Sequence, residues 1–418
     1  MEPFYTRRYA RALDARDPLR AYRKLFHIPK AKGKQLIYLC GNSLGLQPKS
    51  VSKYINTELN DWKNLGVEGH LRAKNPWYYY HHFFTDSIAR LVGAKKDEVV
   101  VMNQLTVNLN LLLISFYRPA GRKVKVLMQA HEFPSDYYAV EQQIKFHGLN
   151  PNECIVEVQP RPGEFTLRTE DIIRKIDELH EELALVMFSA VNYYTGQLFE
   201  IQKISEACCR YGIVLGLDLA HAIGNVPLKL HDWNVDFATW CSYKYLNSGP
   251  GGVSGIFVNR YHAKNFDLPR LAGWWGNDEK TRFTMPKHFV PQPGAAGWQL
   301  SNAPVLSMAA HRAALDIFDR AGMKAIREKS LRLTGYLRRL IEHLNPQHLQ
   351  IITPPNPQEH GAQLSIRTLR NGKALFKKIT QAGVVADWRE PDVIRVAPAP
   401  LYNTYEEVWR FAQILCGA

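Results

Sequence analysis

The chain has 418 residues, a formal net charge of +14, 46% hydrophobic residues and 22% charged residues. The composition is ordinary for a soluble globular protein, and the chain is long enough for two unequal lobes. No apolar run approaches the roughly 20 residues that span a bilayer, so we expect no membrane partner. The basic residues are scattered, which favours solvated helix faces over a nucleic-acid-binding stripe.

The six cysteines indicate a reducing compartment. None of them lies in a C-x-x-C pair, and Cys208 and Cys209 are adjacent, so they cannot easily bridge to each other. The N-terminal segment is polar and lacks the apolar core of a secretory signal. We therefore expect a cytoplasmic protein with free thiols.

The first part of the chain predicts an arm and then a loop that can approach a ligand. Residues 1–30 have the pattern of a short, arginine-rich helical arm. A short strand over 36–40 then leads into GNSLGL, which carries two glycines around Ser43, and a helix follows over 51–64. Glycines let the backbone approach a ligand closely, although an ordinary structural loop is the default interpretation.

The next segment, GVEGHLRAKNPWYYYHHFF, is aromatic and rich in histidine, with His70 near its start. A zinc site is conceivable, but no cysteine or paired carboxylate supports one. Packing, or contact with an aromatic ligand, is the favoured interpretation, and we expect no metal.

A strand over 99–102 is followed by an apolar helix that begins near Thr106. Backbone N–H groups at a helix N-terminus, beside a threonine hydroxyl, form an anion site. The alternative is that Thr106 only caps the helix, and both can hold together.

Apolar β-type runs then alternate with helical patterns, at residues 124–130, 183–191, 213–222 and 236–240. This alternation predicts a mostly parallel sheet flanked by helices, in which ligands bind outside the carboxyl ends of the strands. The side chains expected at that edge are Phe133, Asp136, Ser189, Asp218, His221 and Lys244.

Lys244 lies between a strand and a glycine-rich loop in CSYKYLNSGPGG. A lysine amine can form a Schiff base with an aldehyde cofactor. Asp218 could face a pyridine nitrogen, with His221 beside it, while Phe133 covers the ring and Tyr243 offers a hydroxyl to a phosphate. The alternatives are a surface lysine beside a turn and an aspartate that caps the next segment. The convergence of these groups disfavours both.

The remaining sequence predicts a smaller α+β lobe. A strand over 253–259 follows the glycine loop, Trp274 lies in a loop, and the Pro/Gly-rich run 281–297 suggests a lid or a dimer contact. Asn302 precedes a long helix, and an amphipathic helix covers 323–344. Further β runs (349–352, 363–366, 393–396) and helices (374–382, 405–415) complete the lobe. We expect an arm over 1–45, a large domain over 46–285 and a small C-terminal domain over 286–418.

Over nearly its whole length the chain resembles the kynureninases, pyridoxal-phosphate enzymes of the aspartate aminotransferase fold (fold type I). The resemblance is carried, in this order, by YLCGNSLGLQPK, LTVNLNLLL, FPSDYYA, YYTGQ, DLAHAIGNV, DFATWCSYKYLNSGPGG, GWWG and IRVAPAPLYN. DLAHA and SYKYL alone would leave other fold-type-I enzymes open.

The resemblance implies roles for particular residues. Lys244 would form the Schiff base, Asp218 would pair with the pyridine nitrogen near His221, and Phe133 would stack on the ring. Leu105, Thr106, Asp136, Ser189 and Tyr243 would line the cofactor and its phosphate. Trp274 and Asn302 would reach the site of the other subunit, which implies a homodimer. Ser43, His70, Asn302 and Arg395 would contact the substrate, with Arg395 clamping its α-carboxylate.

The implied reaction is hydrolysis of the Cβ–Cγ bond of L-kynurenine to anthranilate and L-alanine, within tryptophan catabolism or NAD biosynthesis. Lys244 would remove the α-proton, and Tyr243 would act as a proton donor or shuttle. His70 and Asn302 match the animal-type pattern of the family, which tends to favour 3-hydroxykynurenine and its product 3-hydroxyanthranilate.

Rival functions fall into two classes: another fold-type-I enzyme and a binding protein. A cysteine desulfurase needs a cysteine on a mobile loop, yet the only cysteine after Cys241 is Cys416; an aminotransferase is the other fold-type-I rival. A basic nucleic-acid-binding protein on a dead enzyme scaffold would have lost cofactor residues, but Lys244, Asp218 and Arg395 are present.

Overall fold

The computed structural model describes residues 2–263, 265–344 and 346–417. Its centre is a seven-stranded sheet with the order β4-β10-β9-β8-β7-β5-β6. All neighbouring pairs from β9 to β6 are parallel, whereas β10 runs antiparallel to both β9 and β4. The predicted fold class, a mostly parallel sheet flanked by helices, is confirmed. The strands are β4 (Val99–Val101), β5 (Lys125–Gln129), β6 (Ile155–Val158), β7 (Leu183–Ser189), β8 (Val214–Asp218), β9 (Phe237–Trp240) and β10 (Gly255–Val258).

Apolar residues on both faces of the strands place this sheet inside the large domain. Along β7, Leu185 and Met187 belong to one core, while Val186 and Phe188 belong to the other. Successive side chains in a strand point to opposite faces, so a continuous apolar run indicates a sheet covered on both sides. The helices of this domain are α2 (Val51–Leu65), α3 (Gly69–Arg72), α4 (Thr85–Val92), α5 (Leu105–Phe116), α6 (Pro134–Phe146), α7 (Pro151–Cys154), α8 (Thr169–Leu179), α9 (Ile201–Arg210) and α10 (Arg260–Ala263).

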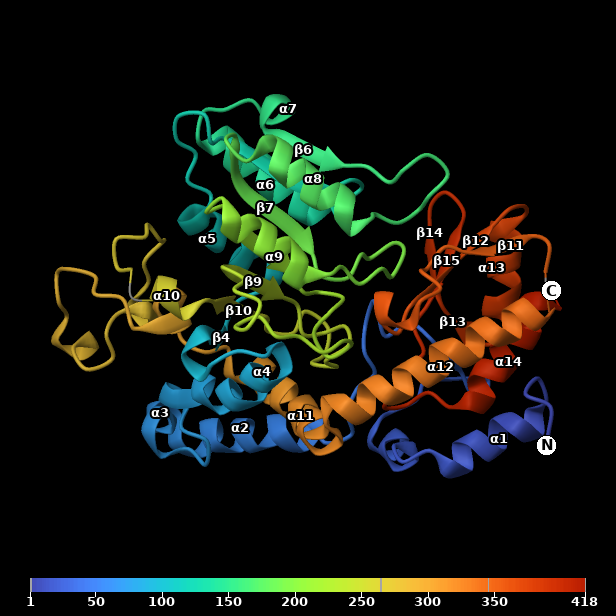
Figure 1. The fold of residues 1–418 in the computed structure, drawn as a ribbon. Coiled ribbons are helices and arrows are strands. Elements are labelled where there is room, and N and C mark those ends of the chain that lie inside the picture. Colours follow the sequence, from blue (N-terminus) through green and yellow to red (C-terminus); the bar gives the residue numbers. More distant parts are fainter. Residues whose placement is uncertain (1, 264, 345, 418) are drawn as a thin grey trace.

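A four-stranded antiparallel sheet, with the order β11-β12-β15-β14, forms the smaller lobe (Figure 1). Its apolar face packs against helices in a separate core. Helix α11 (Val305–Ala321) packs in the core of the large domain and leads into this lobe. The elements of the lobe are α12 (Met323–Leu344), β11 (Leu349–Ile351), β12 (Leu364–Thr368), α13 (Gly372–Gln381), β13 (Val384–Val385), β14 (Asp387–Arg389), β15 (Val393–Val396) and α14 (Tyr405–Cys416).

The N-terminal segment is tied to this C-terminal lobe. Its elements are α1 (Arg7–Arg16), β1 (Lys30–Ala31), β2 (Lys34–Gln35) and β3 (Ile37–Tyr38), and β3 pairs in parallel with β13. The Asp14 carboxylate accepts from the backbone N–H groups of Tyr405 and Glu406 at the start of α14. Asp17 forms a buried ion pair of 2.7 Å with Lys329 of α12. The arm therefore lies along the C-terminal helices, as Figure 1 shows.

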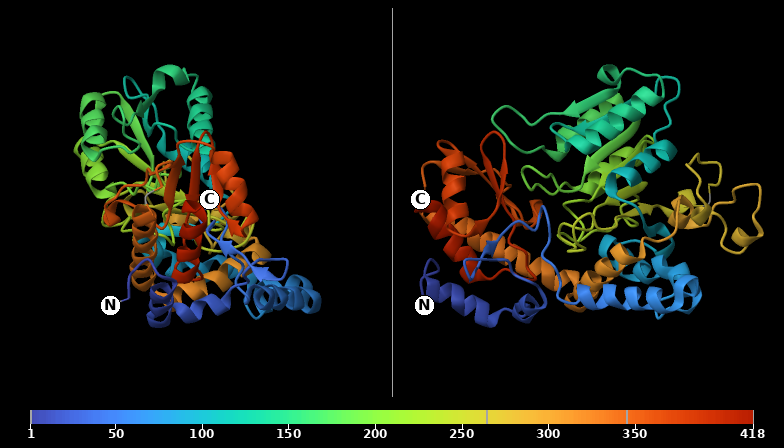
Figure 2. Two further views of the ribbon diagram at one scale, coloured as in Figure 1. Left: turned by 90° about the vertical axis from the view of Figure 1, so that its right-hand side faces the viewer. Right: turned by 180° about the vertical axis from the view of Figure 1, so that it is seen from behind.

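The segment between β10 and α11 projects from the large domain. It contains short 3-10 turns, including Trp274–Gly276 and Arg282–Thr284. Figure 2 shows it at the opposite end of the molecule from the small lobe, in agreement with Figure 1. Several apolar side chains along it are exposed, among them Trp274, Phe283, Met285 and Val290.

Candidate active site

Three neighbouring parallel strands bring their ends to one edge of the large sheet. Ser189, the last residue of β7, is the register partner of Asp218, the last residue of β8. Asp218 in turn lies opposite Thr239 of β9, just before the loop that carries Lys244. This edge is where open α/β sheets bind their ligands.

Lys244 lies at the centre of the cluster. Its Nζ is 3.1 Å from His221 Nε2 and 5.7 Å from the centroid of the Phe133 ring. The GNSLGL loop packs against this turn, because the Gly45 N–H donates to the Tyr243 carbonyl oxygen at 2.8 Å. A Cβ on Gly45 would collide with the carbonyl oxygen of Lys244, so the close approach requires a glycine.

His221 is held as a neutral imidazole. Burial lowers its pKa well below the ordinary value, and the positive charges of Lys244, Arg395 and Arg389 lower it further. Because an ammonium group can only donate hydrogen bonds, His221 Nε2 is the acceptor when Lys244 is charged. His221 can therefore hold the lysine through this hydrogen bond while staying neutral.

Buried acidic groups also lie beside this lysine. Burial raises the pKa of Asp218, although the Lys244 ammonium opposes this shift, and Asp218 Oδ1 accepts from the Ala220 N–H at 2.8 Å. Burial and the neighbouring carboxylates of Asp218 and Glu132 raise the pKa of Asp136 well above its ordinary value. Asp136 Oδ2 is buried without a hydrogen-bond partner. Such a pocket fits the protonated pyridine ring of pyridoxal phosphate, which brings positive charge and an N–H donor.

The N-terminus of α5 provides the candidate anion site. The helix begins at Leu105 with Gln104 as its N-cap, and no side chain caps it. The alternative that Thr106 is the N-cap is therefore wrong, because Thr106 lies inside the first turn. The first N–H groups of α5 have no partner within the helix. Backbone bonds between Met102 and Ser254 and between Ser254 and Asn103 fix this terminus beside the start of β10.

Tyr243 and Leu105 are both partly buried, and both flank the same sheet edge. Burial and the neighbouring Cys241 and Asp218 raise the pKa of Tyr243, so its hydroxyl keeps its proton at neutral pH. The hydroxyl is thus able to donate a hydrogen bond or a proton.

Arg395 of β15 reaches toward this region from the small lobe. It is 1% exposed, its Nε donates to Asp387 Oδ2 at 2.6 Å, and its Nη2 donates to the same oxygen. Its Nη1 donates to the Tyr193 carbonyl oxygen at 2.5 Å. The Tyr193 ring lies between the two lobes, 5.2 Å from the Phe133 ring and 5.8 Å from the Arg395 guanidinium. These bonds use three of the five N–H donors of an arginine, which leaves two for a ligand.

Tyr193, Asp387 and Glu132 were not predicted as site residues from the sequence. The YYTGQ motif contains Tyr193, but only the tertiary contacts show that it touches both Phe133 and Arg395. Asp387 and Glu132 lie in segments whose sequence pattern does not distinguish a buried acid from an exposed one.

The structure does not bring every predicted residue to Lys244. Ser43 is exposed on the loop that packs on Tyr243, whereas His70 lies on α3 with its ring edge-on to Trp77 at 5.5 Å. Trp274 is 44% exposed on the projecting segment, and Asn302 is also exposed. Among the contacts of the described residues, none joins His70, Trp274 or Asn302 to Lys244. Figures 1 and 2 place α3 and the projecting segment away from the small lobe.

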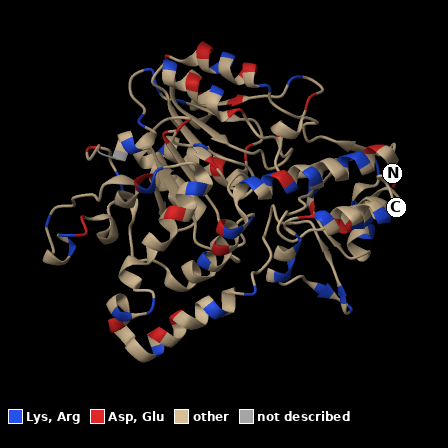
Figure 3. Ribbon diagram, turned by 60° about the horizontal axis from the view of Figure 1, so that its bottom comes forward, with Lys and Arg blue, Asp and Glu red and all other residues tan. Residues whose placement is uncertain are grey.

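Within the described ranges, no group of three or more His, Cys, Asp or Glu side chains is placed to hold a metal ion. The histidine-rich stretch forms a 3-10 helix, Trp77–Phe84, whose His81 is buried. All six cysteines are unpaired. Lys and Arg are interspersed with Asp and Glu over the helices, as Figure 3 shows, rather than gathered in one stripe.

None of the helices that the structure describes combines the length and the apolar character needed to cross a membrane.

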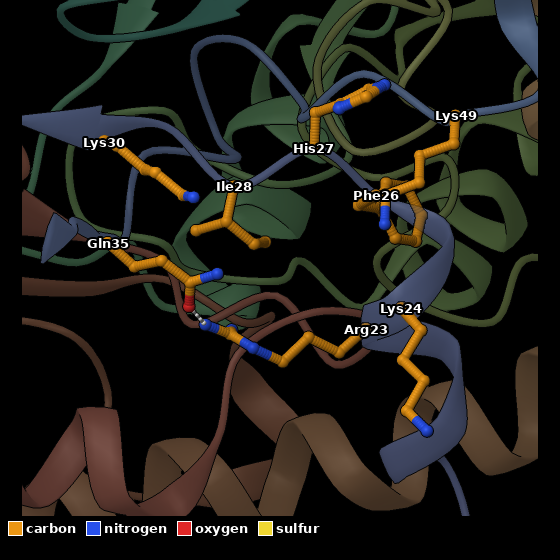
Figure 4. Close-up of a pocket in the computed structure, with 8 residues that line it drawn as sticks. All are labelled: Arg23, Lys24, Phe26, His27, Ile28, Lys30, Gln35 and Lys49. Carbon is orange, nitrogen blue, oxygen red and sulfur yellow. Dashed lines mark hydrogen bonds between the residues drawn. The ribbon is translucent and has the colours of Figure 1, made fainter. Parts of the chain in front are cut away.

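A second cavity, of about 490 Å³, lies on the N-terminal arm and is lined by Arg23, Lys24, Phe26, His27, Ile28, Lys30, Gln35 and Lys49. Its charged ends do not converge. Arg23 donates to Gln35 at 3.2 Å and forms an ion pair with Glu407, while Figure 4 shows Lys24 pointing away from Lys30 and Lys49. A bound anion needs several donors aimed at one point, and the site at Lys244 is better built.

Solved structures identify the class of fold. A mutant of C-DES with glycine covalently linked to its PLP cofactor superposes with a TM-score of 0.77 at 16% identity, covering 91% of this chain and 96% of that one. The cysteine desulfurase CsdA from Escherichia coli superposes with a TM-score of 0.76 at 14% identity, covering 95% and 97%. The chain thus has the fold of PLP enzymes of fold type I.

Sequence comparison narrows this class. A kynureninase of Myxococcus xanthus is 52% identical, covering 98% of this chain and 96% of its own length. Kynureninases of Koribacter versatilis and Flavobacterium johnsoniae are 50% and 49% identical, each covering 98% of this chain and 96% and 97% of their own lengths. Residues 326–415 match the model of the kynureninase C-terminal domain. The chain belongs to the kynureninase family.

Proposed function

We propose that the protein is a kynureninase that uses pyridoxal phosphate to hydrolyse the Cβ–Cγ bond of L-kynurenine, giving anthranilate and L-alanine. One observation carries the proposal. This chain is about half identical to curated kynureninases. It gathers Lys244, His221, Asp218 and Phe133 at the ligand-binding edge of a fold-type-I sheet.

The cofactor would be held by residues from several strands and one helix. Lys244 would hold its aldehyde carbon, Asp218 would face its ring nitrogen beside His221, and Phe133 would cover the ring. The remaining contacts are assigned to Leu105, Thr106, Asp136, Ser189 and Tyr243. When bound, the cofactor supplies an electron sink for carbanions formed on the substrate.

The protein side chains would manage the protons. The Lys244 amine would take the proton from Cα of the substrate, and neutral His221, 3.1 Å away, can accept a hydrogen bond from it. The oxygen of a water molecule bonds to the ketone carbon Cγ while one of its protons passes to the ketone oxygen. The Cβ–Cγ bond then breaks with its electron pair left on Cβ, and Cγ leaves as the carboxyl group of anthranilate. The Tyr243 hydroxyl donates a proton to Cβ and regains one from this acid, and Lys244 returns a proton to Cα, which completes alanine.

The two donors that remain on Arg395 would bind the substrate α-carboxylate. A planar guanidinium suits a carboxylate because two parallel N–H groups match its two oxygens. We assign Ser43, His70 and Asn302 to the rest of the substrate, and 3-hydroxykynurenine as a second substrate that gives 3-hydroxyanthranilate. Rates on both substrates test this assignment: a strong preference for kynurenine contradicts a role for His70 and Asn302 in binding the extra hydroxyl.

A homodimer would complete the site. Trp274, Asn302 and His70 lie away from Lys244 within one copy, so they would serve the site of a second copy. We also propose a cytoplasmic location, which the six unpaired cysteines support. The same proposal keeps the division into an arm (1–45), a large domain (46–285) and a small domain (286–418), and a role in tryptophan catabolism or NAD biosynthesis.

A pyridoxal phosphate titration and a product assay test the function together. We expect the purified protein to show a visible absorption band with the cofactor and to release fluorescent anthranilate from L-kynurenine. Lys244→Ala should lose both the band and the turnover, whereas Lys49→Ala, at the cavity beside the arm, should keep both. A wild-type protein with neither band nor product refutes the proposal.

A further inference from the structure

Glu132 is a buried acid that the proposed mechanism does not use. It lies in HEFPSD, three residues after the last residue of β5, directly precedes Phe133, and is 6% exposed. A carboxylate in such a place loses its hydration, so partners must replace the lost water. Its partners therefore show what its burial achieves.

Three donors surround the Glu132 carboxylate. Gln129 Nε2 donates to Oε2 at 2.6 Å, while the Ser189 hydroxyl and the Phe133 N–H each donate to Oε1 at 2.8 Å. All three partners present hydrogens, so the geometry suits an ionised, acceptor-only carboxylate. Burial and the nearby Asp218 carboxylate oppose this and raise the pKa of Glu132 to about 7.

Two of these partners are proposed cofactor contacts on different strands. Phe133 follows β5 and Ser189 ends β7, and the two strands are paired in parallel. Gln129 Nε2 also donates to Ser189 Oγ at 3.1 Å, and Gln129 Oε1 accepts from Asn192 Nδ2 at 3.3 Å. Glu132 is thus the shared acceptor that joins the two walls of the pocket.

The bonds also define what Ser189 can offer to a ligand. Its one hydroxyl hydrogen is used on Glu132, and one lone pair accepts from Gln129. The remaining lone pair can only accept. A ligand group that meets Ser189 must therefore bring a donor.

We propose that Glu132 is a positioning residue of the cofactor pocket, whose carboxylate fixes the backbone of Phe133 and holds Ser189 as a hydrogen-bond acceptor toward the bound cofactor. This inference rests on the proposed function, because it takes pyridoxal phosphate as the ligand. Glu132 itself need not touch the cofactor.

The test measures the dissociation constant of pyridoxal phosphate for the apoprotein by absorbance titration. Glu132→Gln places an amide NH₂ against the Gln129 NH₂, and we expect affinity to fall about tenfold. Ser189→Ala should weaken binding by a similar factor. The double variant should be no weaker than either single one, because both changes remove the same contact.

A swap of the two side chains provides the rescue. In Gln129→Glu combined with Glu132→Gln, the acceptor and the donor of the 129–132 contact exchange places. The Gln oxygen at 132 still accepts from Ser189 and Phe133, and only the donor from residue 129 to Ser189 is lost. Affinity should return to within about threefold of wild type. If cofactor affinity depended only on a negative charge at position 132, the swap would not restore it, because the charge has moved to position 129.

Glu98 offers a matched control. It is also fully buried and accepts from Lys95 N–H at 2.7 Å, Arg260 N–H at 3.0 Å and His231 Nδ1 at 2.8 Å. It precedes β4 and so lies at the other edge of the sheet. Glu98→Gln should lower the unfolding midpoint without changing cofactor affinity.

The outcomes separate the two hypotheses. If wild-type protein does not bind pyridoxal phosphate, the proposed function fails. If it binds but Glu132→Gln binds equally well, or if the Glu132 and Ser189 effects add fully, or if the swap does not restore affinity, the positioning role is overturned.

Discussion

The predicted site residues form an inner group (Lys244, Asp218, His221 and Phe133) and an outer group (Trp274, Asn302 and His70). The two groups differ in burial and in whether their members meet within one chain. Lys244, Asp218, His221 and Phe133 meet within one chain, at strand ends packed between two apolar cores. Trp274 and Asn302 are exposed and lie away from them. The difference agrees with the proposal that one chain builds the cofactor end of the site and that Trp274 and Asn302 of a second copy complete it.

The two groups also differ in what fixes them. Neighbouring strands fix the inner side chains, because the parallel register sets Ser189 opposite Asp218. The outer residues lie on a short helix and on a segment without strands, where exposed apolar side chains are available to a partner. A two-fold axis would let each copy complete the other.

The largest expected effect is at the inner group. Asp218→Asn keeps the oxygen that accepts from Ala220 but loses the negative charge that faces the cofactor ring. We expect kcat to fall about 10³-fold, measured by anthranilate fluorescence. Asp236→Asn is the control, because Asp236 is buried before β9 and accepts from Leu215 N–H at 2.7 Å. Equal losses in the two variants would show that burial, not position, explains the effect.

The second prediction concerns the pH dependence of the apoprotein. The pKa of Glu132 is about 7 in the folded state against 4.5 in its ordinary state. The folded state therefore binds more protons between these values, and this group lowers the free energy of unfolding as pH rises. From pH 5 to pH 8 the wild type should lose about 2 to 3 kcal/mol relative to Glu132→Gln, measured by urea unfolding. Parallel pH curves for the two proteins would contradict the raised pKa.

The third prediction separates two arginines that share Asp387. Arg395→Lys loses the planar fork proposed for the substrate carboxylate, so KM for kynurenine should rise about 30-fold. Arg389 contacts the same Asp387 oxygen at 3.0 Å but is 35% exposed. Arg389→Lys should change KM by less than about threefold. Similar changes of KM in both variants would contradict the proposal that Arg395 binds the substrate carboxylate.

The smallest effect is a recovery of activity that tests the outer group directly. Lys244→Ala and the double variant Trp274→Ala/Asn302→Ala should each have little activity alone. Mixed and reassembled, they should regain about a quarter of wild-type activity, because half the dimers are mixed and each mixed dimer has one intact site. No recovery, despite mixed dimers seen by native mass spectrometry, would place all these residues in the site of their own chain.

Much of the architecture follows from local sequence. The apolar runs predict β5, β7, β8, β9 and β10, and the helical spacing predicts α12 over Met323–Leu344. The edge strand β6 and the short strands β13 and β14 were missed. A strand of two or three residues has too little periodicity to recognise, since its pairing partner defines it.

The candidate site was only partly predictable. Lys244, Asp218 and His221 carry recognisable chemistry at strand ends, and the kynureninase motifs indicated their roles. Thr106 was given an N-cap alternative that is wrong, because helix ends are the least certain feature of a sequence pattern. Tyr193 and Asp387 gave no local signal, as their positions depend on contacts between the two lobes.

The sequence by itself determined the fold class and the family and predicted Lys244 as the reactive lysine, because strand periodicity and motif order are local properties of the chain. Only the tertiary structure decided that Glu132 joins Phe133 to Ser189, that Asp387 and Tyr193 hold Arg395, and that His70, Trp274 and Asn302 stand apart from Lys244. The physical reason is that a buried polar group is defined by the partners that replace its water, and those partners come from distant parts of the chain.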